Sequence, residues 1–197
     1  MAIEQCFGFL LFAVVAAITP GPSNVMLTAA GARGGVVRGL PCLLGVGVGM
    51  AMLIFGVALG LGGLVANAAV MRTLNWLGAA FLLWLAWKIA RTGPGMGEAE
   101  AKPVGFFGAA LFQWINPKSW LVAAAAAAAY VEPAPEGTLL RAAALATLFV
   151  AAALPSGLVW LAFGASMQRL LRGERGARAF NVALAAALAA SVALIVR

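Results

Sequence analysis

Two short segments combine helix-breaking residues with polar side chains inside apolar stretches long enough to cross a membrane. The first segment consists of Thr19, Pro20, Gly21, Pro22, Ser23 and Asn24. Each proline removes a backbone donor and clashes with the preceding turn, so a continuous helix is excluded. We expect a new helix to begin near Pro22, with its free amide groups and positive dipole end in the membrane centre. Such a helix start is suited to binding a carboxylate group.

The second segment consists of Asn116, Pro117, Lys118 and Ser119. Pro117 suits the first turn of a helix. Lys118 lies about 12 residues from the end of its span, roughly 18 Å along the helix, which is too far for its side chain to reach the membrane surface. A charge at the bilayer centre costs about 2.5–3.5 kcal/mol or more and marks a functional site by default. We expect Lys118 to face a cavity and bind a substrate carboxylate; the alternative is a lysine that braces the fold through backbone carbonyls.

Several other residues are candidates for the wall of a pocket at these two breaks. They are Gln113, Trp114, Trp120, Asn75 and Asn181. Amide side chains within membrane spans more often form hydrogen bonds between helices than contacts with a ligand. Trp114 and Trp120 flank the second break, where we expect them to shape the pocket.

The composition indicates a protein that is solvated by lipid. Of the 197 residues, 64% are hydrophobic and 10% are charged, whereas a soluble domain is roughly half apolar. The net charge of +7 comes from basic residues in short segments between apolar runs, a pattern that does not fit a nucleic-acid-binding surface. The sequence contains no His, no Asp and two Cys. We therefore expect no metal site, no cofactor, no catalytic residue and no enzymatic activity.

The apolar runs predict an all-α membrane protein with six transmembrane helices, the first and fourth interrupted by proline. Charge-free stretches place these helices at about 7–31, 40–64, 74–91, 104–130, 138–164 and 179–196. Nine of the 13 Lys and Arg residues fall between helices 1 and 2, 3 and 4, or 5 and 6, and three fall on the other side. The positive-inside rule then places both termini in the periplasm of a bacterium, with the chain in the inner membrane.

The two halves of the sequence resemble each other weakly. A shift of 97 residues places Thr19-Pro20 on Asn116-Pro117. Residues 1–91 and 104–197 would each form a three-helix repeat, joined by a cytoplasmic linker at 92–103. Because three is an odd number, the repeats would insert in opposite directions. This is the inverted-repeat pattern of secondary transporters, whose sites lie at interrupted helices near the midplane.

Glycines recur at helical spacing on the second predicted span. They are Gly45, Gly49, Gly56, Gly60 and Gly63. Small residues let another helix backbone approach closely. The seam is expected to pack within the chain; a homodimer interface is the alternative.

Three segments carry a resemblance to a known family. TPGPSN, followed by Gly31, Arg33 and Gly34, resembles the signature of the LysE/RhtB family of amino-acid exporters. LNWLGAAFLLWLAWKIART and GFFGAALFQWINPKSWL are similar to the family's third and fourth spans. The resemblance implies export of amino acids or derivatives from the bacterial cytoplasm, driven by the proton gradient. At the positions that match the family's motifs, the resemblance implies functional residues. They are Pro20, Gly21, Pro22, Asn24, Asn116, Pro117 and Lys118.

The expected mechanism is alternating access, with the two halves rocking around a site built from both helix breaks. The expected partners are an amino-acid-like substrate, a proton as the coupling ion and membrane lipid. Proton coupling usually uses an intramembrane carboxylate or His, but all six Glu map to loops or helix ends. Lys118 or the substrate's own ionisation would then carry the coupling; otherwise transport is uncoupled.

Three other functions are alternatives to a carrier: a channel, a thiol relay and a heavy-metal exporter. An anion-favouring or small-solute channel could use the same helix ends. A thiol relay would need Cys6 and Cys42 to meet, although they map near opposite faces of the membrane. A heavy-metal exporter would need ligands that the spans lack.

Overall fold

The described chain is entirely helical. The computed structural model describes residues 1–91, 104–131, 137–171 and 173–195, and no strand occurs within these ranges. In chain order the elements are α1 (Ile3–Ile18), α2 (Pro22–Gly56), the π-helical segment η1 (Val57–Leu61), α3 (Gly63–Ala66), α4 (Ala68–Ala90), α5 (Phe106–Ile115), α6 (Pro117–Tyr130), α7 (Thr138–Leu170) and α8 (Glu174–Ile195). The predicted linker 92–103 lies outside the described residues.

Four of the described segments are long and apolar enough to cross a membrane. They are Pro22–Leu61, Ala68–Ala90, Thr138–Met167 and Glu174–Ala193. α1 and α5 are shorter apolar helices. The structure is therefore that of an all-helical protein with several candidate membrane spans.

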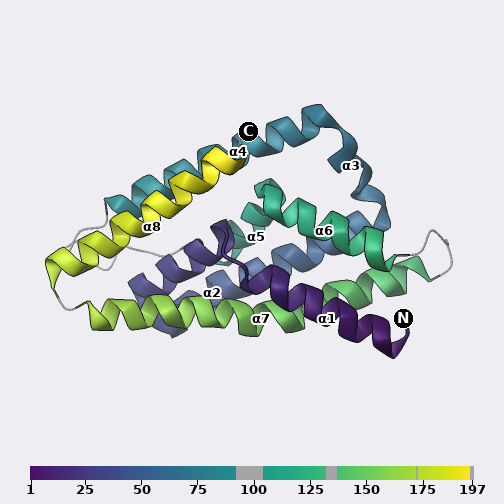
Figure 1. The fold of residues 1–197 in the computed structure, drawn as a ribbon, viewed down its shortest axis with the longest axis horizontal. Coiled ribbons are helices and arrows are strands. Elements are labelled where there is room, and N and C mark those ends of the chain that lie inside the picture. The colour runs from purple at the N-terminus through teal and green to yellow at the C-terminus, as the bar shows by residue number, and fades with distance from the viewer. Residues whose placement is uncertain (92–103, 132–136, 172, 196–197) are drawn as a thin grey trace.

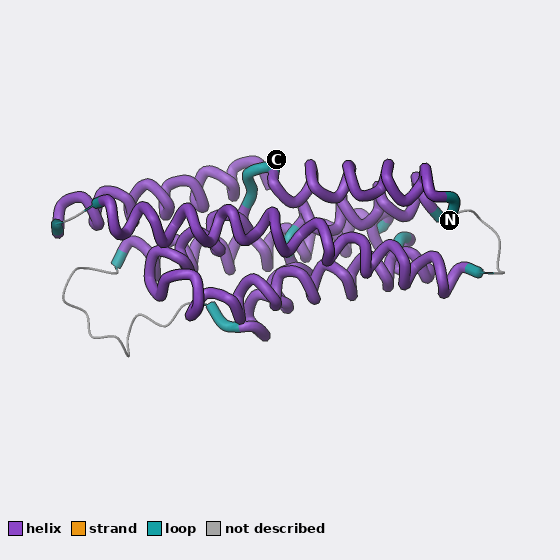
Figure 2. Tube along the Cα trace, turned by 90° about the horizontal axis from the view of Figure 1, so that it is seen from below, coloured by secondary structure: helices purple, strands orange, loops and turns teal. Residues whose placement is uncertain are grey.

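The helices lie roughly along one long axis (Figures 1 and 2). α2 packs against α7 and α5 and so forms the centre of the structure. α1 lies along α7, and α4 lies beside α8 and runs in the opposite direction (Figure 1). The buried side chains form two clusters: one joins α2, α4, α5, α7 and α8, and the other joins α1, α2, α6 and α7.

Local backbone chemistry sets several helix boundaries. Gly35 has a φ of 70° and divides α2 into two helical segments, because glycine adopts this conformation without steric cost. The sequence had predicted a longer gap, from residue 31 to residue 40; that prediction is wrong because one glycine is enough to break the helix. Asn67 caps α4 by accepting hydrogen bonds from Ala69 N at 3.0 Å and Val70 N at 3.2 Å.

Three helices extend further than the apolar pattern predicted. α4 begins at Ala68 rather than 74, α7 continues to Leu170 rather than 164, and α8 begins at Glu174 rather than 179. A stretch without charged residues marks only the part of a helix that is apolar enough for the hydrocarbon core of a membrane. A helix can continue into charged residues at the membrane surface, because each added residue gains a backbone hydrogen bond.

The predicted glycine seam is correct for part of its length. A Cβ at Gly49 would lie 2.5 Å from the carbonyl oxygen of Ala110 in α5, and a Cβ at Gly45 would collide with the carbonyl of Phe106. These glycines therefore allow α2 and α5 to pack closely within the chain. Gly60 and Gly63 have no neighbouring atom within 4 Å of such a Cβ, so the seam does not extend to them.

Candidate functional site

Two proline-containing helix boundaries lie near the middle of the long axis (Figure 1). α1 ends at Ile18 and α2 begins at Pro22. α5 ends at Ile115 and α6 begins at Pro117. In both cases proline occupies the first turn, where its missing N–H costs no helical hydrogen bond.

Side chains cap the end of α1. The last carbonyls of a helix lack partners within the helix, and buried carbonyls without partners are costly. Asn24 Nδ2 donates to Ala17 O at 3.1 Å and to Thr19 O at 2.7 Å. Lys118 Nζ donates to the same Thr19 carbonyl at 2.7 Å. The cationic side chain of the second break is therefore bound to the negative dipole end of the helix that precedes the first break.

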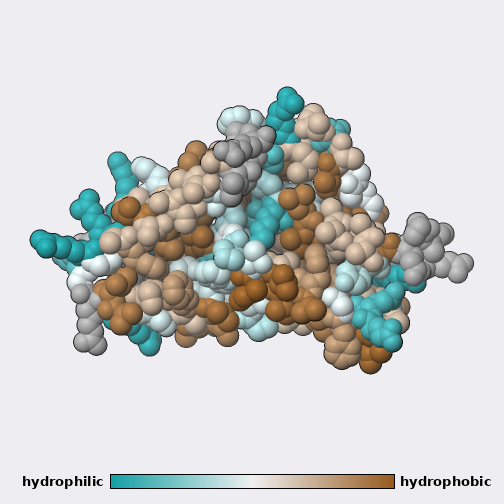
Figure 3. Space-filling model, in the orientation of Figure 1, coloured by the Kyte–Doolittle hydropathy of each residue, from teal (hydrophilic) through white to brown (hydrophobic). Residues whose placement is uncertain are grey.

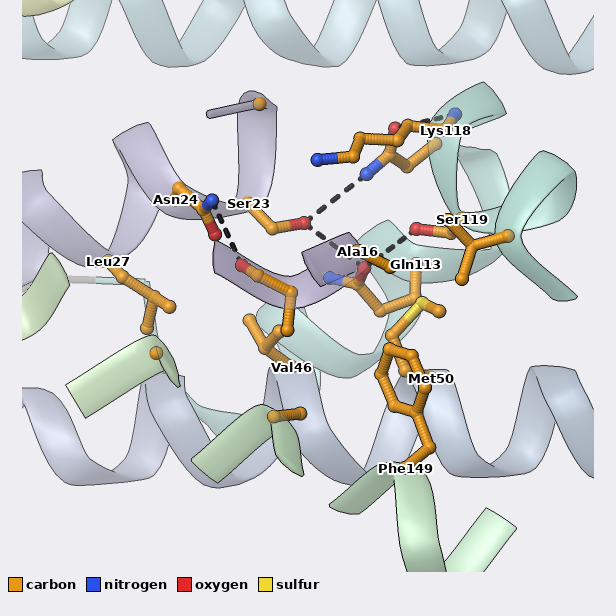
Figure 4. A pocket seen from close by; sticks show the side chains of 16 residues that line it. Ala16, Ser23, Asn24, Leu27, Val46, Met50, Gln113, Lys118, Ser119 and Phe149 are labelled. Carbon is orange, nitrogen blue, oxygen red and sulfur yellow. Dashed lines mark hydrogen bonds between the residues drawn. The ribbon is translucent and has the colours of Figure 1, made fainter. Parts of the chain in front are cut away.

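A hydrogen-bond network connects the two breaks. Asn116 Nδ2 donates to Ser23 Oγ at 3.2 Å, and Ser23 Oγ donates to Gln113 Oε1 at 3.1 Å. Ser119 Oγ donates to the same Gln113 oxygen at 2.9 Å (Figure 4). The Asn116 side chain also accepts from the backbone N–H of Lys118 at 3.2 Å and so caps α6. The starts of α2 and α6 are held together by neutral polar groups.

A cavity lies beside this network. Its empty volume, counted together with its open mouth, is about 480 Å³. Its lining residues are Ala16, Ala17, Gly21, Ser23, Asn24, Leu27, Val46, Met50, Gln113, Asn116, Lys118, Ser119, Val122, Phe149, Ala153 and Gly157. Figure 4 shows the labelled polar side chains on one side and the larger apolar ones on the other.

Lys118 supplies the only cation among the described residues that line the cavity, and no carboxylate lines it there. A lysine ammonium has three donors, one of which binds Thr19 O. A Cβ at Gly21 would lie 3.0 Å from Lys118 Cδ and 3.1 Å from Nζ. The absence of a side chain at Gly21 thus leaves room for the lysine. Lys118 both lines the cavity and contacts a backbone carbonyl. That it binds a substrate carboxylate stays a prediction.

The candidate residues divide into two groups. Seven line the cavity: Gly21, Ser23, Asn24, Gln113, Asn116, Lys118 and Ser119. The other eight do not line it: Thr19, Pro20, Pro22, Pro117, Trp114, Trp120, Asn75 and Asn181. The first four of these belong to the helix boundaries themselves. Asn75 lies on α4 and Asn181 on α8. Trp120 Nε1 donates to Trp114 O at 2.7 Å, which braces the second boundary.

The start of α6 differs from the sequence-based expectation. In a site built from both helix breaks, the amide groups at this second helix start were expected to be free for a ligand, like those near Pro22. Instead, the Lys118 amide bonds to the Asn116 side chain, and the Ser119 amide bonds to Asn116 O at 2.9 Å. An asparagine before a helix is a strong capping residue, and this signal was present in the sequence. The positive character of the cavity therefore depends mainly on the Lys118 ammonium.

The apolar wall of the cavity was not predicted from the sequence. Val46 and Met50 of α2 and Phe149, Ala153 and Gly157 of α7 line the cavity opposite the polar groups. Their spacing of four residues places each set on one helix face. That spacing is visible in the sequence, but nothing in it indicates which of the apolar faces meets the breaks.

Asn24→Ala is expected to destabilise the protein, because Ala17 O would lose its side-chain donor. A buried group left without its hydrogen bond costs about 1–3 kcal/mol. Thermal unfolding of the purified protein in detergent should show a lower Tm. Thr147→Ala is the control: the exposed Thr147 hydroxyl donates to Ala143 O at 2.8 Å, and we expect little change. Equal Tm values for the two variants would contradict the capping role of Asn24.

Comparison with known proteins gives consistent matches. The family model described as LysE type translocator matches residues 14–196. A cysteine/O-acetylserine efflux protein of Klebsiella pneumoniae is 33% identical over 126 residues, which is 64% of each chain. The protein of that name from Salmonella typhimurium is 34% identical over 128 residues, or 64% of this chain and 65% of the relative. The match therefore spans less than two thirds of the length of these relatives.

A longer match extends over most of the chain. The cysteine/O-acetylserine efflux protein of Escherichia coli K12 is 28% identical over 180 residues, or 90% of each chain. No solved structure matches the chain.

Proposed function

The chain belongs to the LysE translocator family, and we propose that it exports small amino acids or their derivatives across the bacterial inner membrane. The observation that supports this most strongly is the cavity at the two helix boundaries, which contains one ammonium and several neutral hydrogen-bonding groups. The relatives named as cysteine/O-acetylserine efflux proteins point to a substrate of that kind.

We propose six membrane spans arranged as two inverted repeats of three. α1 with the first segment of α2, and α5 with α6, would form the broken spans. The second segment of α2 with η1 would correspond to α7, and α4 to α8. The antiparallel pairing of α4 and α8 supports this arrangement (Figure 1). Residues 1–91 and 104–197 would be the repeats, and 92–103 the linker.

The proposed orientation places the basic end of the protein in the cytoplasm and both termini in the periplasm. Arg33 and Arg38 lie on either side of the kink at Gly35 in α2. Lys88, Arg91 and Arg169 lie at the ends of α4 and α7. The sequence assigns all five to one side. Hydrophilic residues gather at the left end of the face in Figure 3, where α7 ends and α8 begins. An excess of Lys and Arg marks the cytoplasmic side of a membrane protein.

In the proposed binding mode, the substrate carboxylate binds Lys118 Nζ. It also accepts from the Ser23 hydroxyl, whose single donor must first leave Gln113 Oε1. A charge-assisted hydrogen bond to Lys118 is stronger than a bond to any of the neutral polar groups of the cavity. The substrate amine would meet uncharged oxygen atoms, for which the Asn24 side chain and nearby backbone carbonyls are candidates. Lys118 already contacts Thr19 O, so a carboxylate would compete with that carbonyl for the ammonium.

Alternating access would break contacts that join the two halves. Lys118 to Thr19 O and Ser23 to Gln113 are two such contacts. Trp160 Nε1 of α7 donates to Ile18 O at 3.2 Å and is a third. Substrate binding that weakens the first contact would favour the conformation in which α1 has moved away from α6. Export would be proton-driven, with Lys118 or the ionisable substrate as the coupling group.

Counterflow in proteoliposomes tests this function. Vesicles containing purified protein and unlabelled L-serine or O-acetyl-L-serine should accumulate the labelled compound transiently and saturably. An uncoupled flux that never saturates and shows no counterflow would instead indicate a channel. The absence of any protein-dependent flux of either compound would contradict the proposed substrate class.

A further inference from the structure

The apolar side of the cavity has a graded shape. Phe149, Ala153 and Gly157 occupy successive turns of one face of α7, and all three line the cavity. Their side chains decrease in size along the helix, from an aromatic ring to a methyl group to a hydrogen atom. Phe149 is 3% exposed and Ala153 is 7% exposed, so both are fixed by packing. The wall that α7 gives to the cavity therefore becomes less bulky from Phe149 toward Gly157.

Gly157 cannot be the adjustable position of this wall. A Cβ at Gly157 would lie 2.5 Å from Leu43 Cδ1 and 3.1 Å from Leu27 Cδ1. A side chain at this position would therefore displace Leu43 and alter the packing between α7 and α2. Ala153 and Phe149 also line the cavity, and a change in their side-chain volume would change its size.

The opposite helix completes an apolar pocket. Val46 and Met50 lie one turn apart on α2, are 8% and 6% exposed, and line the same cavity. Figure 4 shows Val46, Met50 and Phe149 on the side away from Lys118 and Ser119. A molecule whose carboxylate binds Lys118 would therefore direct its side chain toward this wall.

The charges of the cavity restrict that side chain further. Within the described chain, Glu4 and Glu174 lie at the starts of α1 and α8, away from the lining residues. A cationic side chain would find no opposite charge there, and an anionic one would compete with the substrate carboxylate for Lys118. Burial of an unpaired charge against apolar groups is strongly unfavourable.

We propose that Val46, Met50, Phe149 and Ala153 form the side-chain subsite of the transporter, selecting amino acids with short, uncharged side chains. This inference rests on the proposed export function. Phe149 closes the end of this side-chain subsite, and Ala153 sets the width of the subsite. Side chains up to about the size of that of O-acetylserine would fit, whereas phenylalanine and lysine would be transported poorly.

Two variants with opposite effects test the subsite. Counterflow would be measured with labelled L-serine, O-acetyl-L-serine, L-phenylalanine, L-lysine and L-aspartate. Phe149→Ala enlarges the subsite and should raise the phenylalanine-to-serine ratio of transport rates about 10-fold or more, since one methylene in an apolar pocket is worth about 10- to 200-fold. Ala153→Leu narrows it and should lower the ratio of O-acetylserine to serine by a similar factor. L-lysine and L-aspartate should remain poor substrates throughout.

Ala151→Leu is the matched control, because Ala151 is an exposed residue of α7 outside the cavity. It should leave all ratios at their original values. For a variant that binds these compounds but does not transport them, the ligand-induced increases in Tm compare the affinities instead of the transport rates. Unchanged ratios in both Phe149→Ala and Ala153→Leu would overturn the subsite. If the unaltered protein showed no serine or O-acetylserine counterflow, the proposed function itself would fail.

Discussion

Lys118→Met is expected to weaken substrate binding by roughly 10- to 150-fold, which corresponds to the loss of a hydrogen bond to a charged group. Lys118 is the one cation among the described residues that line the cavity, and its Nζ lies 2.7 Å from Thr19 O at the first helix boundary. Methionine keeps an unbranched chain of similar length but removes the charge and all three donors. The measurement is concentration-dependent counterflow of L-serine and O-acetyl-L-serine in proteoliposomes, which should show a higher KM.

Two further variants make this result specific. Lys88→Met removes a cation from the last turn of α4, where the ammonium lies 5.2 Å from the Trp84 ring centroid and outside the cavity; its KM should stay unchanged. Lys118→Arg keeps the charge with a different shape and should retain part of the affinity. An unaltered KM in Lys118→Met would remove the lysine from the binding site. Unaltered stimulation of export by a proton gradient would remove it from the coupling step.

The general character of the protein was readable from the sequence, because it depends on composition and on local effects. Long apolar stretches predict helices in lipid, and the structure is all-helical with four long apolar segments. Proline acts on its own turn, so candidate helix boundaries could be placed without knowledge of the fold. Lys118 stood out because a charge in an apolar segment is rare and costly.

The contacts between helices could not be predicted from the sequence, because they depend on which helix faces pack against each other. Trp114 and Trp120 were expected to shape the pocket, yet their hydrogen bond to each other braces the second boundary instead. Asn24 was assigned to ligand binding, and its side chain also caps the carbonyls at the end of α1. The apolar wall from α7 depends on the packing of α7 against α2, to which residues from both halves of the chain contribute.

Gly164→Ala is expected to destabilise the protein by about 1–3 kcal/mol or more, the usual cost of overpacking a well-packed interior. A Cβ at Gly164 of α7 would collide with the carbonyl oxygen of Thr28 in α2 and lie 2.9 Å from its Cα. These are backbone atoms, which cannot move aside as a flexible side chain can. Thr28 is 1% exposed, so the two helices would have to separate.

The consequence should extend to transport, because this contact sets the distance between the two walls of the cavity. Ser23 and Asn24 belong to α2, and Phe149 and Ala153 belong to α7. The measurements are thermal unfolding in detergent and serine counterflow, both of which should decrease in Gly164→Ala. Gly63→Ala is the same chemical change in open space, with no atom within 4 Å of the new Cβ. Since alanine is a better helix former than glycine by about 1 kcal/mol, the control should be neutral or slightly stabilising. Shifts in Tm of the same sign and size in both variants would show that close packing of α2 on α7 does not limit the stability of the fold.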